Sequence, residues 1–100
     1  MNILLVCNGG LSTSVLMKKM EQWEKETGKE FKIKATSFAA LLSHNFSSFD
    51  CFLVGPQISF RLDDLKEMTG LPGAAISSFD YALSNCEAIY KQAKALVDGK

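Results

Sequence analysis

The sequence lacks the features that several large classes of protein require. Its 11 basic and 11 acidic residues give a formal net charge of zero, so it has no basic excess with which to bind nucleic acid. Its longest apolar runs fall far short of the ~20 residues that cross a bilayer. No basic segment precedes the first apolar run, which is too short for a secretory signal. These absences favour a cytoplasmic globular protein.

Cysteine, histidine and the common nucleotide motifs are also scarce. Cys7, Cys51 and Cys86 are an odd number of cysteines at wide spacing, and His44 is the single histidine. This pattern fits neither a disulfide framework nor a CxxC metal site. The sequence contains no G-x4-G-K-[ST] phosphate loop and no G-x-G-x-x-G dinucleotide fingerprint. We therefore expect neither a metal nor a cofactor.

What the sequence does contain is an alternation of strand-like and helical patterns. Continuous apolar runs at 3–6 and 51–54 predict strands covered on both faces. An alternating run at 31–36 and a short run at 74–76 predict sheet edges. The alternation predicts a single α/β domain over residues 1–100, in which a four-stranded parallel sheet of order 2-1-3-4 has helices on both faces.

The helices are predicted from apolar residues that recur on one face. The first helix begins near Ser14 and ends at Gly28, and a short one covers about 38–43. The inward residues predicted for the other two helices are Ile58, Leu62, Leu65 and Met68, and then Ala82, Cys86, Ile89, Ala93 and Leu96.

The segment that follows the first apolar run is the most informative. It reads C-N-G-G-L-S-T-S from Cys7 to Ser14 and opens a predicted helix. Backbone N–H groups in such a loop converge on an anion, and the helix dipole adds positive potential that favours a thiolate. The reversal of winding between the first and third strands directs ligands to this edge of the sheet. We therefore predict that Cys7 is an accessible nucleophile at the mouth of the sheet and forms a phosphocysteine.

The scarcity of arginine narrows this chemistry. A cysteine-dependent phosphatase loop reads C-x5-R-[ST], in which the arginine clamps the phosphate. The sixth residue after Cys7 is Thr13, and the only arginine, Arg61, lies in another segment. Asp80 is a conceivable general acid but has no arginine to work with. A loop that has the nucleophilic cysteine and the phosphate-binding amides but lacks the arginine suits a carrier. Such a carrier passes its phosphoryl group to an acceptor other than water.

At this point the residues resemble a known family. The loop at 7–14 is similar to the phosphocysteine loop of the IIB subunits of the bacterial phosphoenolpyruvate-dependent sugar phosphotransferase system, in its lactose/cellobiose/chitobiose branch. Leu53-Val54-Gly55-Pro56-Gln57-Ile58 resembles that branch's segment after the third strand. The cysteine loop has a shape shared with low-molecular-weight phosphatases, whereas the two segments together are more specific.

The resemblance implies a carrier with two partners. Cys7 would take a phosphoryl group from a phosphohistidine on a IIA protein and give it to a β-glucoside-, galactoside- or chitobiose-type sugar held by the membrane permease IIC. The protein would be a cytoplasmic monomer that associates peripherally with that permease. The phosphoryl oxygens would be held by Asn8, Gly9, Gly10, Leu11, Ser12, Thr13 and Ser14.

Three residues outside the loop have two readings. Pro56 and Gln57 either form only the turn by which the chain leaves the strand, or they support the cysteine loop or contact a partner. Tyr81 either covers the phosphate or packs on the rim of the site. Leu11, Phe60 and Tyr81 could form a docking surface.

The remaining candidates have plainer interpretations. Cys51 and Cys86 are interpreted as packing thiols, His44 as a solvated loop residue and Arg61 as a helix-surface residue.

Two functions of other classes remain as alternatives. One is a low-molecular-weight-type cysteine phosphatase or an arsenate reductase-like enzyme, which would turn over p-nitrophenyl phosphate. The other is a regulatory or binding module without transfer activity, which would gain no mass from a phosphorylated relay.

Overall fold

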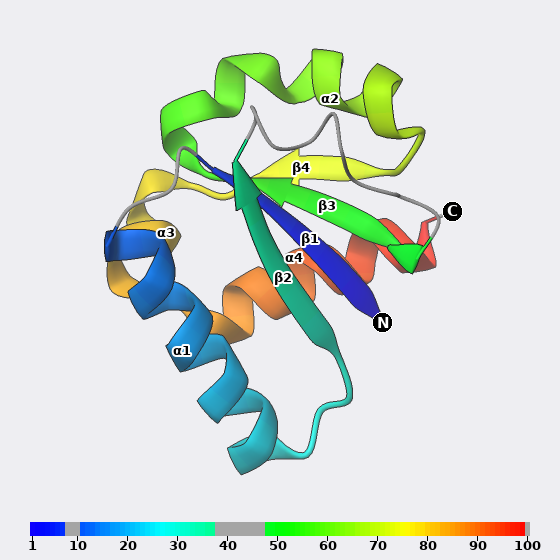
Figure 1. Cartoon of the computed structure of the whole chain (residues 1–100). Coiled ribbons are helices and arrows are strands. Elements are labelled where there is room, and N and C mark those ends of the chain that lie inside the picture. The colour runs from blue at the N-terminus through cyan, green and yellow to red at the C-terminus, as the bar shows by residue number, and fades with distance from the viewer. Residues whose placement is uncertain (8–10, 38–47, 100) are drawn as a thin grey trace.

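Strands and helices alternate along most of the described chain, as the sequence predicts, although most of the segment between the second and third strands lies outside the described residues and the chain ends in two consecutive helices (Figure 1). The computed structural model describes residues 1–7, 11–37 and 48–99, and the side chains of residues 11–13 lie outside that description. The elements are β1 (Asn2–Cys7), α1 (Leu11–Thr27), β2 (Lys32–Ser37), β3 (Cys51–Val54), the 3-10 helix η3 (Pro56–Arg61), α2 (Leu62–Thr69), β4 (Gly73–Ala75), α3 (Ser78–Leu83) and α4 (Cys86–Asp98).

The four strands form one parallel sheet in the order β2-β1-β3-β4, which confirms the predicted order. Ile3 of β1 lies opposite Ile33 of β2 on one side and Cys51 of β3 on the other. The carboxyl ends of the strands therefore meet at one edge of the sheet, where Cys7 is the last residue of a central strand.

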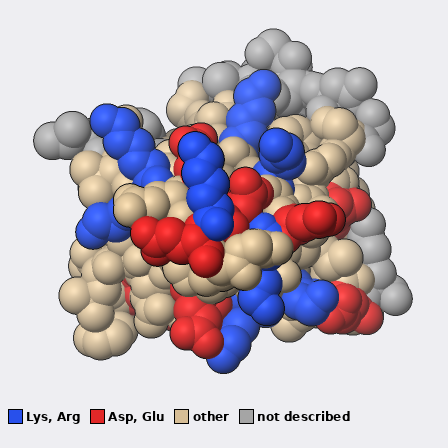
Figure 2. Space-filling model, turned by 90° about the horizontal axis from the view of Figure 1, so that it is seen from below, with Lys and Arg blue, Asp and Glu red and all other residues tan. Residues whose placement is uncertain are grey.

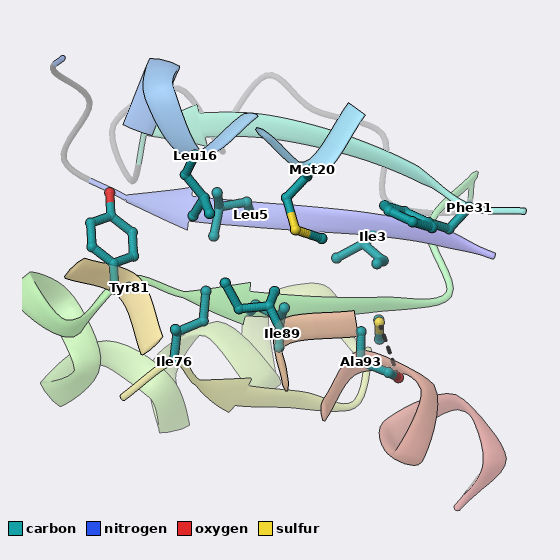
Figure 3. Close-up of a cluster of buried hydrophobic side chains, with 11 residues drawn as sticks. Ile3, Leu5, Leu16, Met20, Phe31, Ile76, Tyr81, Ile89 and Ala93 are labelled. Carbon is teal, nitrogen blue, oxygen red and sulfur yellow. Dashed lines mark hydrogen bonds between the residues drawn. The ribbon is translucent and has the colours of Figure 1, made fainter. Parts of the chain in front are cut away.

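Each face of the sheet has its own apolar core, because alternate residues of the central strands point to opposite faces. Ile3 and Leu5 contribute to one cluster, which α1 and α4 cover with Leu16, Met20 and Ile89 (Figure 3). Tyr81 stands at the end of this cluster near the carboxyl end of β1. The other cluster consists of Leu4, Val6, Phe52, Val54, Ile58 and Leu65, so η3 and α2 cover the second face.

Two of the predicted helices differ in extent from the structure. α1 begins at Leu11, three residues before the predicted start, and ends where Gly28 takes a positive φ of 71°. The last predicted helix is instead two helices, α3 and α4. Ser84 takes a left-handed φ of 50°, and the Asn85 side chain accepts a hydrogen bond from the Ala88 N–H as the N-cap of α4.

This break explains one of two wrong predictions about inward residues. Ala82 belongs to α3 rather than to the α4 register and is exposed. Met68 near the end of α2 is also exposed, at 39%. The helix predicted at 38–43 and His44 lie outside the described residues.

The charged side chains are mixed in sign on the surface that Figure 2 shows. Basic side chains lie among aspartates and glutamates across this face, without a broad area of one sign. None of the helices in the described part of the chain is long and apolar enough to cross a membrane.

Candidate functional site

Cys7 occupies the carboxyl end of β1, beneath the point where the chain leaves the sheet for α1. Its side chain is buried, with 2% of the residue exposed, and Sγ donates a hydrogen bond to the carbonyl oxygen of Thr36 in β2 at 3.7 Å. The prediction of an accessible thiol is therefore wrong for this conformation. The sulfur is turned toward the neighbouring strand because a parallel partner places a backbone carbonyl within its reach.

The first turn of α1 begins four residues after Cys7 in the sequence. Because α1 begins at Leu11, the backbones of Leu11, Ser12 and Thr13 belong to this turn, and Ser14 in it is exposed. No acidic residue occurs in the first turn, so the positive end of the helix dipole there is not neutralised by its own helix. Asn8, Gly9 and Gly10, which the sequence assigns to phosphate binding, lie outside the described residues.

Gly55, the residue after β3, brings several of the candidate residues together. Its N–H donates to the carbonyl of Val6 at 2.9 Å, which fixes it against β1 beside Cys7. A Cβ added to Gly55 would lie 3.6 Å from the Cβ of Cys7 and 3.6 Å from Cε2 of Tyr81. The same Cβ would lie 2.9 Å from Oε1 of Gln57. Cys7, Gln57 and Tyr81 therefore share the small volume around this glycine.

The three candidates outside the loop differ in exposure. Pro56 is half-buried at the start of η3, and its carbonyl accepts a hydrogen bond from Ser59 Oγ at 3.2 Å. Gln57 is exposed. Tyr81 is only 7% exposed, so its ring is part of the core and offers little surface for docking.

The groups that a phosphatase would need are engaged elsewhere. Asp80 Oδ1 accepts a hydrogen bond from Asn85 Nδ2 at 3.2 Å, which braces the turn between α3 and α4. The Arg61 guanidinium lies 3.7 Å from a carboxylate oxygen of Asp64 and 5.5 Å from the centre of the Phe60 ring. Arg61 is exposed, as the sequence predicts for a helix-surface residue.

The other two thiols lie inside the fold. Cys51 Sγ is buried and donates to the carbonyl of Ala93 at 3.8 Å, so the thiol joins β3 to α4 as a packing residue (Figure 3). Cys86 is half-buried at the start of α4 and donates to the carbonyl of Ser84 at 3.3 Å. Burial raises the pKa of the Cys86 thiol, which therefore stays protonated at neutral pH.

Metal binding is not suggested by the described part of the chain, where no group of three His, Cys, Asp or Glu side chains lies close enough to hold an ion. A surface hollow of about 520 Å³ lies at the opposite end of the sheet from Cys7, beside Met1, Gly28 and Phe31.

Sequence reasoning missed three features of this edge. Thr36 was not expected to hold the thiol, because nothing in the alternating pattern of β2 shows which carbonyl faces a neighbouring side chain. The sequence also does not show that the side-chain oxygen of Gln57 lies close to Gly55. Phe79 and Leu83 are 68% and 59% exposed on α3, and their spacing of four residues is a signal that could have marked a shared helix face.

Comparisons with known proteins agree with this architecture. Residues 2–95 match the family described as "PTS system, Lactose/Cellobiose specific IIB subunit". The galactose-specific EIIB component of Lactococcus lactis subsp. cremoris (strain MG1363) is 31% identical over 96% of this chain and 95% of its own length. The oligo-beta-mannoside-specific EIIB component of Bacillus subtilis (strain 168) is 30% identical over 95% and 94% of the two chains.

A solved structure extends the likeness to the whole fold. The solution structure of the cellobiose-specific phosphotransferase IIB component of Borrelia burgdorferi is 33% identical, with a TM-score of 0.80, and the match covers 100% of this chain and 94% of that one. The chain is thus a phosphotransferase with a role in sugar phosphotransfer. It belongs to the lactose/cellobiose-specific family of IIB subunits of the phosphotransferase system, which work with IIA and IIC components.

Proposed function

We propose that Cys7 is the residue that carries the phosphoryl group. The observation that carries this proposal is the place of Cys7 at the carboxyl end of a central strand, four residues before the start of a 17-residue helix with no acidic residue in its first turn. Amides at a helix N-terminus stabilise a phosphoryl dianion without a guanidinium. Cys51 and Cys86 lack this setting, since Cys51 lies at the opposite end of its strand and Cys86 begins a helix, α4, that has the acidic Glu87 in its first turn.

The transfer consists of two displacements at phosphorus. In the first, the Cys7 sulfur loses its proton and forms an S–P bond while the P–N bond to the donor histidine of a IIA protein breaks, and the freed imidazole nitrogen regains a proton. In the second, a sugar hydroxyl oxygen attacks phosphorus, the S–P bond breaks, and the proton of the hydroxyl returns to the thiolate. Both steps depend on stabilising charge on the three equatorial oxygens.

The resting hydrogen bond of Cys7 has a consequence for the first step. A thiol that donates to Thr36 has its sulfur turned toward β2 and shielded from solvent. Loss of the proton removes this bond, and rotation about the Cα–Cβ bond of Cys7 then turns the sulfur toward the carboxyl edge of the sheet. The donor thus meets the sulfur only as the thiol gives up its contact with β2.

Exposed apolar side chains surround this edge and suit a transient protein partner. Phe60 in η3 is 76% exposed, and Phe79 and Leu83 in α3 are 68% and 59% exposed. Both segments follow strands at the same edge as Cys7, so a donor that reaches the sulfur must approach over this part of the surface (Figure 1). We assign these side chains to contact with the IIA donor, because exposed aromatic residues contribute strongly to such interfaces.

The sugar is assigned by class alone. The relatives act, by their names, on galactose and on oligo-β-mannosides, and the Borrelia structure is of a cellobiose-specific component. The proposed acceptor is therefore a hexose or β-linked oligosaccharide held by a membrane IIC permease, with which this chain associates peripherally during the second step.

The proposal is tested by loading the chain from phosphoenolpyruvate through the relay and a IIA protein, with intact-mass detection of one added phosphoryl group. Cys7→Ser should abolish loading through an S–P bond, whereas Cys86→Ser, a matched change at a half-buried thiol, should load like the wild type. Equal loading of Cys7→Ser and wild type would remove Cys7 from the mechanism. Turnover of p-nitrophenyl phosphate above background would favour a phosphatase instead.

A further inference from the structure

Gly55 leaves a space that adjoins the side chain of Gln57. Its φ of −67° and ψ of 155° are extended values that any residue adopts, so the backbone does not require glycine at this position. A side chain there would instead approach Gln57 Oε1 at 2.9 Å, closer than ordinary van der Waals contact. The missing Cβ therefore leaves room for the side chain of Gln57 to fold back across the end of β3.

The chain around Gly55 holds this arrangement in place. The Gly55 N–H bonds to Val6 in β1, and the Gly55 carbonyl accepts from the Ile58 N–H at 3.1 Å. Pro56 has a fixed φ at the first position of η3, and Ile58 is buried in the core. Gln57 lies between these two anchored residues, so its side chain starts from a backbone position that is well defined.

The carboxamide of Gln57 and the sulfur-bearing residue both adjoin the empty Cβ position of Gly55. The Cβ position that lies 2.9 Å from Gln57 Oε1 also lies 3.6 Å from the Cβ of Cys7. The buried ring of Tyr81 stands at the same distance on another side of this volume. Gln57 is exposed and ends in an amide with two N–H donors and one acceptor, so it can meet a group that arrives from solvent at Cys7.

We propose that the Gln57 side-chain amide binds a phosphoryl oxygen on Cys7 and takes the place that a guanidinium has in cysteine phosphatases. This inference rests on the proposed function of Cys7. The amide N–H groups are uncharged donors, so they orient the phosphoryl group without neutralising it. A phosphocysteine held in this way is readily given up to an acceptor, whereas a bidentate arginine holds a phosphate far more strongly.

Arg61 is the competing candidate, and its contacts argue against it. Its guanidinium lies 3.7 Å from Asp64 and 5.5 Å from the centre of the Phe60 ring. Asp64 and Phe60 belong to the exposed surface of α2 and η3, and the Arg61 side chain is itself 46% exposed. Gln57, in contrast, approaches the volume that adjoins Cys7.

The test compares Gln57→Ala and Gln57→Glu with the wild type in single-turnover loading over a range of phosphorylated IIA concentrations. Removing one preorganised donor should lower the maximal loading rate at least ~10-fold, and the carboxylate of the Glu variant should lower it further through repulsion of the dianion. The half-saturating IIA concentration should stay within about twofold, because the amide contacts the phosphoryl group and not the partner.

The matched control is Gln22→Glu, the same chemical change on the exposed face of α1, where Gln22 Nε2 bonds to Glu26. It should leave loading unchanged. Gly55→Ala should reproduce part of the Gln57→Ala loss, because its methyl group displaces the carboxamide, while thermal unfolding shows that both variants remain folded.

The outcomes separate this inference from the function on which it rests. A wild type that does not load, or that loads on a residue other than Cys7, would overturn the proposed function. Loading on Cys7 with a wild-type maximal rate in Gln57→Ala would overturn the role of Gln57 alone. A raised half-saturating IIA concentration at an unchanged maximal rate would do so too, and would assign Gln57 to the partner interface.

Discussion

Two glycines, Gly73 and Gly55, show how the interior of this sheet differs from its carboxyl edge. Both follow the same principle, since each leaves a space that a neighbouring side chain fills. At Gly73 the space is filled by the ring of Phe52, the fully buried residue of β3 that lies opposite it in the sheet. At Gly55 it is filled by the polar end of an exposed residue, Gln57. The first serves the stability of the fold, and the second is the basis of the role proposed for Gln57.

The same difference separates the aromatic residues at the two ends of the molecule. Trp23, Phe31 and Tyr90 pack against one another at the amino end of the strands, with ring centres 5.3 to 6.0 Å apart. Phe60 and Phe79 at the carboxyl edge are largely exposed. Substitutions at one end should therefore change unfolding with little effect on transfer, and substitutions at the other should do the reverse.

The largest effect is expected at Gly73. A methyl group in Gly73→Ala would overlap the ring of Phe52, which is fully buried in the core. We expect the free energy of unfolding in urea to fall by about 3 kcal/mol or more, as in an overpacked core. Gly70→Ala is the control. Its added Cβ has no neighbour within 4 Å, so its only cost in stability is that alanine must adopt a positive φ of 68°. An equal loss in both variants would mean that packing on Phe52 is unimportant.

A smaller loss is expected when the aromatic cluster is opened. Trp23 is half-buried and contacts Phe31 and Tyr90, so Trp23→Ala should lower the free energy of unfolding by about 2 kcal/mol, less than a fully buried tryptophan. The maximal loading rate per folded molecule should not change. A fall in that rate would show that the two ends are coupled and would break the comparison.

At the carboxyl edge the effect should appear in partner affinity. Phe79→Ser removes an exposed ring from α3, so the free energy of unfolding should change by less than about 0.5 kcal/mol. The half-saturating concentration of phosphorylated IIA should rise about fivefold, as for one aromatic contact in a transient interface. Titration of single-turnover loading rates measures this value. An unchanged value would place the donor elsewhere on the surface.

Much of this arrangement is predictable from the sequence because it depends on local patterns. The continuous apolar runs at 3–6 and 51–54 identify the two central strands, since only strands covered on both faces tolerate them. The alternating run at 31–36 and the short run at 74–76 are then assigned to the edge strands, which gives the order of the sheet. Cys7 is placed at the end of a strand by the same reasoning.

The rest depends on contacts between segments distant in the sequence. The apolar register from Ala82 to Leu96 predicts one helix, but Asn85 caps a new helix and Ser84 takes a left-handed conformation. The burial of Cys7 depends on a carbonyl of β2 29 residues away. The link between Gly55 and Gln57 depends on a side-chain conformation that no local pattern specifies.

The smallest expected effect concerns Cys86, which belongs to neither end of the comparison. Burial raises the pKa of its thiol above the ordinary value of 9.0, and the nearby Lys19 lowers it by less. The unfolded chain therefore loses this proton at a lower pH than the folded chain. The contribution of Cys86 to stability is fully present below pH 9.0 and is lost as the pH rises through the higher pKa of the folded state.

Urea titrations of wild type and Cys86→Ser should give free energies of unfolding whose difference is constant at neutral pH and shifts in favour of the variant above pH 9.0. A difference that does not change with pH would mean that the thiol ionises as readily in the folded chain as in the unfolded one, and that α4 begins in contact with water.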